Sequence, residues 1–222
     1  MSIPQDMPKR RSVPASAKRG PIVGAPGEPG VREEILSAAR GIIQRYGFRK
    51  TTMDDIARTM GRERSSLYYY FPGKRELMQA LIENELADIS RNVHAEVTRQ
   101  KDAVSRLRVY TTCRLEQIAA RAAVYAETEP DRRARADILN LAEQRRAFDE
   151  GEQRYFADLL LAGMREGQIR RLSEPEVQLF TRFAFAALRG IELEVILDPS
   201  RSADLKTEVQ ASLDIIFRGL LR

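Results

Sequence analysis

Apolar residues recur every three or four positions along most of this chain, which is the spacing of amphipathic α-helices. The first such segment spans Val31–Tyr46, and Gly47 behind it is suited to end a helix. Further helices are expected over residues 76–98 and 101–127. Residues 131–150 keep a thinner apolar stripe, and their many charges are interpreted as a solvated helix face. The pattern predicts an all-α fold.

The C-terminal part of the chain carries the most apolar helices. A glycine joint at Gly151 is expected to precede a strongly apolar helix that ends near Gly167. Ser173 and Pro175 are good starting residues for a helix over 174–197, and a last helix is expected over 203–221.

The helix over 174–197 is apolar on two sides. One stripe consists of Val177, Phe180, Ala184, Leu188, Ile191 and Val195, and the other of Leu179, Phe183, Ala186, Gly190, Leu193 and Leu197. A helix of this kind must bury both sides, so it either lies inside a monomer or pairs with a second copy. Of these two alternatives, we favour a dimer through helices 174–197 and 203–221.

Residues 52–74 have the spacing of two short helices joined by a tight turn. Thr52 can cap the first helix, and two acidic residues follow in its first turn. Gly61 can adopt the left-handed conformation that a turn requires. The spacing of Ala57, Gly61 and Leu67 matches a helix-turn-helix, whose second helix enters the major groove of DNA.

The residues after this second helix are suited to contact DNA. Tyr68, Tyr70 and Lys74 supply hydroxyls and an ammonium, which are common phosphate ligands. The alternative is that the aromatic residues only pack a small domain, and for Phe71 packing is the better interpretation.

This stretch resembles the TetR family of bacterial transcriptional regulators. Over about residues 31–80, the resemblance rests on Gly47-Phe48, Thr51-Thr52, Ile56-Ala57, Gly61, Leu67-Tyr68, Tyr70-Phe71, Lys74 and Leu77. The chain departs from the usual family pattern after the turn, where Arg62-Glu63 and Ser65 replace Val-Ser and a small residue. The resemblance implies a homodimer with an N-terminal three-helix DNA-binding domain and a C-terminal helical bundle that binds a small-molecule effector.

Charge is distributed as a nucleic-acid partner would require. Residues 1–76 hold 15 Lys and Arg against 8 Asp and Glu, whereas residues 77–222 hold 22 against 24. A basic tail does not account for this, since residues 31–76 still hold 10 against 6. The positive field therefore lies on the half that carries the helix-turn-helix.

The chain is expected to have three regions. Residues 1–30 hold six of the ten prolines and no apolar periodicity, so they are expected to form a disordered basic arm. Whether this arm contacts DNA or only aids solubility stays open. Residues 31–76 are the expected DNA-binding domain, and residues 77–222 the expected effector-binding and dimerisation domain. The helix over 76–98 would connect the two.

The candidate DNA contacts lie near Arg62–Tyr70. The candidates for base edges are Arg62, Arg64, Ser65, Ser66 and Tyr69, and those for phosphates are Thr52, Tyr68, Tyr70 and Lys74. Polar atoms near an apolar face suggest a ligand cavity in the bundle, although boundary positions would show the same pattern. The candidate ligand contacts are Tyr110, Cys113, Arg114, Gln117, Tyr155 and Phe183.

The sequence offers no catalytic constellation. His94 is the only histidine and Cys113 the only cysteine, too few for a His/Cys metal site, and a nucleophilic triad would have to use His94. We therefore expect no enzyme, cofactor or metal. Apolar runs far shorter than a membrane span, the lack of a signal-peptide core and the single cysteine indicate a cytoplasmic, nucleoid-associated protein.

The sequence thus predicts a homodimeric DNA-binding transcriptional regulator, a repressor released from its operator by a small molecule. Two alternatives stay open: a sequence-nonspecific DNA-binding protein, and a helical ligand sensor that has lost operator binding. The effector, the operator and the sign of regulation do not follow from the sequence.

Overall fold

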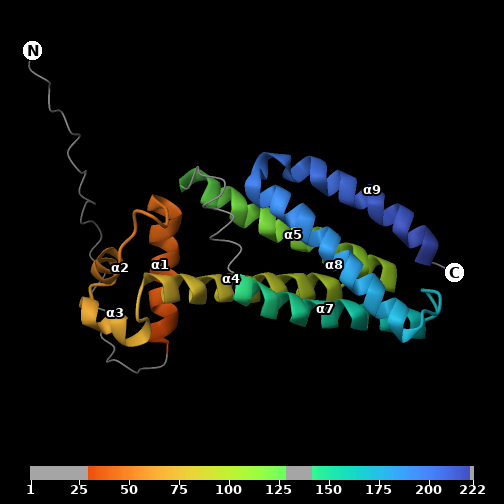
Figure 1. The fold of residues 1–222 in the computed structure, drawn as a ribbon, viewed down its shortest axis with the longest axis horizontal. Helices are drawn as coiled ribbons and strands as arrows, with labels where there is room; N and C mark the ends of the chain where they lie inside the picture. The colour runs from red at the N-terminus through yellow and green to blue at the C-terminus, as the bar shows by residue number, and fades with distance from the viewer. Residues whose placement is uncertain (1–29, 129–141, 221–222) are drawn as a thin grey trace, which may run out of the picture.

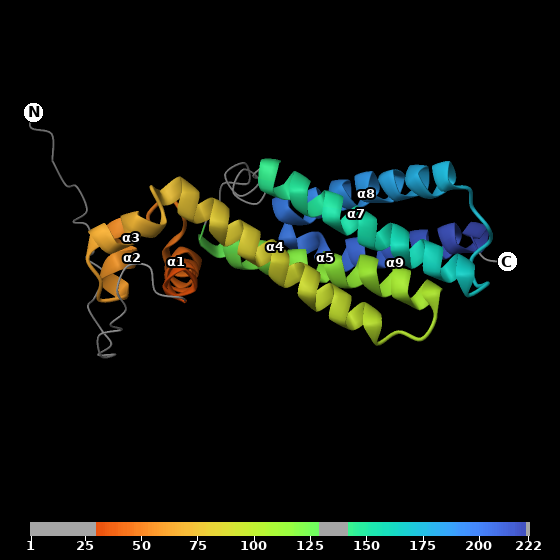
Figure 2. The same cartoon turned by 90° about the horizontal axis from the view of Figure 1, so that it is seen from below.

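The computed structural model describes residues 30–128 and 142–220, and the elements in this part of the chain are α-helices and one 3₁₀ turn (Figure 1). Three short helices form a head at one end of the molecule. Longer helices form a bundle at the other end, and α4 runs from the head into the bundle (Figures 1 and 2). Within the described ranges, no helix combines the length and apolarity that a membrane crossing requires.

The head consists of α1 (Val31–Tyr46), α2 (Met53–Thr59) and α3 (Arg64–Tyr70). Its core is closed by Ile35, Ile56 and Leu67, one from each helix, and all three are completely buried. Gly47 ends α1 with φ 83°, and its N–H bonds to the carbonyl of Ile43. Helices α2 and α3 are too short to be stable alone, so the core that they share with α1 holds the head together.

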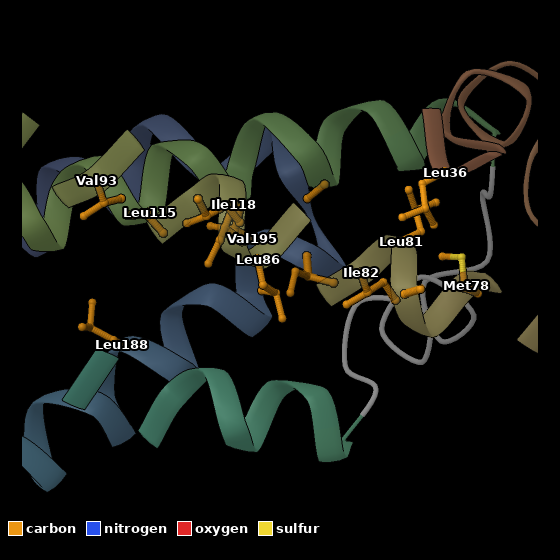
Figure 3. Packing of buried hydrophobic residues seen from close by; sticks show 14 of the residues in the cluster. Leu36, Met78, Leu81, Ile82, Leu86, Val93, Leu115, Ile118, Leu188 and Val195 are labelled. Atoms are coloured by element: carbon orange, nitrogen blue, oxygen red, sulfur yellow. The ribbon is translucent and has the colours of Figure 1, made fainter. Parts of the chain in front are cut away.

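Helix α4 (Lys74–Thr98) belongs to both parts of the molecule. Figure 3 shows its N-terminal residues Met78 and Leu81 next to Leu36 of α1, whereas Val93 lies farther along in the bundle. Arg40 of α1 also pairs with two carboxylates of α4, at 3.5 Å from Glu85 and 3.4 Å from Asp88. The expected domain boundary at residue 76 therefore falls inside this helix.

The bundle adds α5 (Ala103–Thr128), α7 (Ala142–Arg165), α8 (Glu174–Leu197), the 3₁₀ turn η1 (Pro199–Arg201) and α9 (Ser202–Leu220). Helix α5 packs against α4, α7, α8 and α9, so it is the central element (Figure 2). The predicted limits of α1 and α8 are confirmed, and so is Ser173 as the cap of α8, where it forms a capping box with Glu176.

Two features differ from the expectation. Gly151 is not a joint, because α7 continues through it from Ala142 to Arg165. A single glycine costs a helix only about 1 kcal/mol relative to alanine, which the packing of α7 against α5 and α8 outweighs. The expected arm over 1–30 lies almost entirely outside the described residues, as does the first part of the helix expected over 131–150.

Candidate functional site

The start of α2 and the turn after it place α3 on the surface of the head. Thr52 caps α2 through a capping box, in which its hydroxyl accepts from the N–H of Asp55 at 3.2 Å and its own N–H donates to the Asp55 carboxylate at 3.0 Å. Gly61 makes the turn with φ 64°, a conformation that side-chain-bearing residues rarely adopt. Helix α3 then begins at Arg64, with Glu63 in extended conformation at its N-cap.

Helix α3 presents polar side chains outward. Leu67 is its completely buried residue, whereas Tyr69 is 66% exposed and Arg64, Ser65 and Tyr68 are also exposed. Ser66 is half-buried. A short helix anchored by one aliphatic residue, with hydroxyls and a guanidinium on its free side, has the shape and chemistry of a helix that enters the major groove.

The side chain of Arg62 does not lie where it could contact a base. Its side chain is only 6% exposed, and its Nη2 donates to the Glu34 carboxylate of α1 at 3.4 Å. The turn ahead of α3 points this guanidinium back across the head, so in this conformation Arg62 braces α1 and does not extend from α3.

The residues after α3 lie where the head meets α4. Lys74 Nζ lies 4.1 Å from the ring centroid of Phe48 and donates to the carbonyl of Arg49 at 3.5 Å. Burial lowers the pKa of the Lys74 ammonium. Tyr70 is half-buried and its ring stands edge-on to Tyr69, with 5.0 Å between centroids. Phe71 is buried, as the packing interpretation predicted.

The interior of the bundle holds an ion cluster, which we define as Tyr110, Arg114, Arg145, Asp149, Glu152 and Glu192. Arg114 is 1% exposed, and its Nε donates to Glu192 at 2.6 Å. Its terminal nitrogens donate to Tyr110 at 3.1 Å and to Asp149 at 2.9 Å. Arg145 pairs with Glu192 as well. Burial opposes the charge on Arg114, but Glu192, Tyr110 and Asp149 raise its pKa well above the ordinary value.

Glu152 connects this cluster to α4. Its carboxylate accepts from the hydroxyls of Ser90 and Tyr110, and it lies 3.1 Å from Nε2 of His94. His94 also stacks on Tyr155, with 3.6 Å between ring centroids. The helix that leaves the head is therefore joined to α7 by the hydrogen bond from Ser90 to one buried carboxylate, with the His94 ring beside it.

Most of these charged residues were missed by reasoning from the sequence. The charges up to residue 150 were interpreted as a solvated face, which is wrong for Arg145, since that side chain is 5% exposed. A signal was present: Arg145, Asp149 and Glu152 are spaced four and three apart, on one side of a helix. The partner carboxylate, Glu192, comes from α8 and only the fold brings it near.

The structure brings together some of the predicted ligand residues. Tyr110, Arg114 and Tyr155 lie in or beside the ion cluster, and Gln117 and Cys113 are half-buried on α5. Burial raises the pKa of the Cys113 thiol. Phe183 is a correction, because it is 66% exposed on α8 and does not face the bundle interior. Its place in the second apolar stripe explains this better than a ligand role.

A surface cavity of about 250 Å³ lies between α5 and the start of α9. It is lined by Leu115, Glu116, Ala119, Ser202, Ala203 and Lys206. Glu116 and Lys206 form an ion pair there. None of the six predicted ligand residues lines this cavity, so the ion cluster and the cavity are separate places.

Helices α8 and α9 leave large apolar side chains exposed. We call Leu179, Phe183 and Leu193 of α8, with Ile215 of α9, the outer apolar set. Ala186 and Gly190 of the second predicted stripe are exposed too. Exposed apolar groups of this size on adjoining helices are typical of a protein interface.

Comparison with known proteins identifies the family. The model of the bacterial regulatory proteins of the tetR family matches residues 35–81, which include α2, the Gly61 turn and α3. The DNA-binding head of this chain belongs to the TetR family. The chain is a DNA-binding transcriptional regulator with an all-α fold.

One relative is similar over most of the chain, and another over a short stretch. The HTH-type transcriptional repressor KstR2 of Rhodococcus jostii is 27% identical over 201 residues, which cover 87% of this chain and 93% of KstR2. The regulator TtgR of Pseudomonas putida is 38% identical over 53 residues, covering 24% of this chain and 25% of TtgR.

Solved structures share the fold over most of this chain. A transcriptional regulator from Cytophaga hutchinsonii superposes with a TM-score of 0.71 at 22% identity, covering 87% of this chain and 100% of the regulator. SmeT, the repressor of a Stenotrophomonas maltophilia multidrug efflux pump, superposes with a TM-score of 0.63 at 21% identity, covering 86% and 90%.

Proposed function

We propose that this protein is a homodimeric repressor, released from a two-fold DNA site by a small molecule that binds its helical bundle. The observation that carries the proposal is the outward display of α3, which exposes Arg64 and Tyr69 while Leu67 anchors the helix. The names of KstR2 and SmeT, both repressors, support the sign of regulation.

The contacts divide by chemistry. Arg64, Ser65, Ser66 and Tyr69 are proposed to face base edges, where arginine pairs best with guanine. Thr52, Tyr68, Tyr70 and Lys74 are proposed to contact phosphates, which supply affinity more than specificity. Arg62 would join the base contacts only after leaving Glu34, so we assign it to the support of α3.

The outer apolar set is the proposed dimer interface. Phe183 is 66% and Ile215 72% exposed, which is costly in water and favourable against a second copy of α8 and α9. A dimer of this kind carries two heads, and heads about 34 Å apart would match one turn of DNA. Small changes in their spacing would then decide whether both heads fit the same site.

The effector is proposed to act at the ion cluster. Tyr110, Arg114 and Tyr155 belong to this region, and Glu152 links it to α4 through Ser90 and His94. A molecule that competes for these contacts would free α4 to tilt, and the heads would move with it. By linkage, DNA must weaken the binding of such a molecule by the same factor. Action on genomic DNA would place the protein in the cytoplasm, at the nucleoid.

A gel-shift experiment tests the proposal. The duplex would be the region upstream of the protein's own coding sequence, with random-sequence duplex as competitor. A repressor of this kind should keep the upstream duplex bound at a large excess of competitor. Equal competition would favour the sequence-nonspecific alternative, and no shift with either duplex would favour a sensor that has lost DNA binding.

A further inference from the structure

Arg64 is the one exposed guanidinium of α3, and two neighbours hold it from different sides. Its Nε lies 3.1 Å from Oδ1 of Asp54, and its Nη1 donates to Oδ2 of the same carboxylate at 3.4 Å. Its Nη2 donates to the hydroxyl of Tyr68 at 2.9 Å. The guanidinium carbon also lies 5.1 Å from the centroid of the Tyr68 ring.

We propose that Asp54 is a positioning residue for base recognition: together with Tyr68 it fixes the Arg64 guanidinium in the orientation that reads a guanine. This inference rests on the proposed function, in which α3 enters the major groove. It adds a residue of α2, which itself touches no base, to the determinants of sequence preference.

The geometry leaves free the part of Arg64 that guanine needs. A guanidinium has five N–H donors around a planar fork. Asp54 lies against Nε and accepts one N–H of Nη1, and Tyr68 accepts one N–H of Nη2. Each terminal nitrogen carries two N–H groups and keeps one of them, and two N–H donors are what O6 and N7 of guanine require.

Tyr68 can serve this arrangement and still contact DNA. A phenol hydroxyl accepts and donates at once, so the oxygen that accepts from Arg64 can donate its own proton to a phosphate. The proposed phosphate contact of Tyr68 and its support of Arg64 are therefore compatible. The Tyr68 hydroxyl would then contact the DNA backbone and the Arg64 guanidinium at the same time, so the position of the protein along the DNA would fix the position of Arg64.

The fold explains the position of Asp54 only in part, because an acidic residue in the first turn of α2 also interacts favourably with the helix dipole. A carboxylate beside a DNA-facing helix repels phosphates, so it weakens binding unless it does something else. The capping box of α2 uses Asp55 and does not require Asp54. Both partners of the Asp54–Arg64 pair are about half exposed or more, so the pair contributes little to folding. Orientation of Arg64 is what the carboxylate can supply.

An Arg64 side chain that is ordered in advance improves discrimination between base pairs, because only the complex with the matching base pair requires this side chain to be ordered. A good bidentate arginine–guanine pair discriminates by about five- to 150-fold. Holding one long side chain in advance is worth about two- to tenfold of that ratio. Loss of Asp54 should therefore reduce the preference for one base pair and leave other positions of the site unchanged.

The experiment selects binding sites from a randomised duplex library with the full-length protein. The variants are Arg64→Ala, Asp54→Asn and Tyr68→Phe. The control is Glu63→Gln, which also removes a negative charge beside α3 but whose carboxylate contacts Ser65. Thermal unfolding verifies that each variant is folded. Arg64→Ala should abolish the preference for one G·C pair in each half-site. Asp54→Asn and Tyr68→Phe should each weaken that same preference by about two- to tenfold, and Glu63→Gln should retain it.

The outcomes separate this inference from the function on which it rests. If the wild-type protein enriches no sequence, the proposed function fails. If it enriches a site but Asp54→Asn keeps every preference, only the positioning role fails. The same holds if Asp54→Asn tightens binding to all sequences as Glu63→Gln does, since that result assigns Asp54 a purely electrostatic effect. A G·C preference that survives Arg64→Ala also overturns the inference.

Discussion

Glu192 is completely buried in α8, and three arginines hold its charge there. Burial raises the pKa of this carboxyl, but Arg114, Arg145 and Arg189 together outweigh that effect, so the pKa lies below the ordinary value. Arg114 and Arg145 depend on Glu192 in turn, because each donates to its carboxylate. Removal of one partner from such a buried network leaves charges without compensation.

Glu192→Gln should therefore destabilise the protein by about 3–5 kcal/mol, measured by urea unfolding at neutral pH. Glu194→Gln is a matched control two residues along the same helix. Its carboxylate is half exposed and pairs with Arg201 at 2.7 Å, so the loss should stay within about 0.5 kcal/mol. Equal losses for both variants would contradict the structural role of the buried network.

The buried Glu192 carboxylate also predicts that the free energy of unfolding depends on pH. Because the folded pKa of Glu192 is depressed, the unfolded chain takes up this proton first as the pH falls. The contribution of Glu192 to the free energy of unfolding is complete above the pKa of glutamate in the unfolded chain, about 4.3. It is lost as the pH falls towards the pKa of Glu192 in the folded protein. The stability difference between wild type and Glu192→Gln should shrink over that acid range. A difference that stays constant down to the folded pKa would be inconsistent with this assignment.

The position of Lys74 predicts that this residue contributes to DNA affinity but not to sequence specificity. Its ammonium lies at the N-terminus of α4, close to Phe48 and the carbonyl of Arg49. Lys74→Ala should weaken binding to all duplex sequences and reduce the slope of log affinity against log salt by about one unit. Lys101→Ala, beyond the far end of α4, should leave the slope unchanged. A changed sequence preference at unchanged slope would mean that Lys74 contacts bases.

At the scale of elements, α7 contains two glycines with opposite surroundings. A Cβ added at Gly151 would meet nothing within 4 Å. One added at Gly163 would lie 2.6 Å from Cβ of Ala103 and 2.6 Å from Cδ1 of Ile169. Gly163 therefore permits the close approach of α7 to the start of α5, whereas Gly151 only weakens its helix.

Alanine substitutions should separate these two roles. Gly151→Ala should stabilise the protein by about 0.5–1 kcal/mol, because alanine restricts the unfolded chain and favours helix. Gly163→Ala should destabilise it by about 1–3 kcal/mol through overpacking. Urea unfolding of both variants measures the sign of each change in the free energy of unfolding. Shifts of the same sign would show that local space does not govern the two positions.

Elements could be predicted from the sequence where local chemistry decides them. The apolar spacing of α1 and α8, the capping box at Ser173 and the turn at Gly61 depend on residues a few positions apart, and the structure confirms them. The ion cluster could not be predicted in this way. Arg114 and Glu192 are 78 residues apart, and charged residues are rarely buried without partners that only the fold supplies.

The candidate site shows the same division. The exposure of α3 follows from helical periodicity around Leu67, so the sequence could indicate it. The direction of Arg62 depends on the backbone of the turn and on Glu34 of another helix, which the sequence does not reveal. Phe183 fitted two roles, and only the packed bundle shows that its side chain points outward.

At the scale of the whole molecule, α4 has polar contacts with both the head and the bundle. In the head, Arg40 holds it through Glu85 and Asp88. In the bundle, Ser90 and His94 hold it through Glu152. In the proposed function, a change at the ion cluster would reach the head through α4. It would affect DNA binding only if two heads must fit one site together, so the proposal depends on the dimer interface.

Phe183→Glu tests that interface, because it places a charge in the outer apolar set. The variant should sediment as a monomer in analytical ultracentrifugation, and its affinity for a two-fold site should fall by about 10²–10⁴-fold as the second head is lost. Leu161→Glu on α7 is the matched control, since Leu161 is also an exposed large apolar residue but lies outside the set. It should remain a dimer.

Circular dichroism separates loss of the interface from loss of the fold. A helical, monomeric Phe183→Glu protein that retains weak binding to a single half-site would assign the defect to assembly. In that case each head reads DNA independently, and avidity accounts for the full-site affinity. A Phe183→Glu protein that stays dimeric would place the interface away from α8, and the spacing of the two heads would then be set by a different face of the bundle.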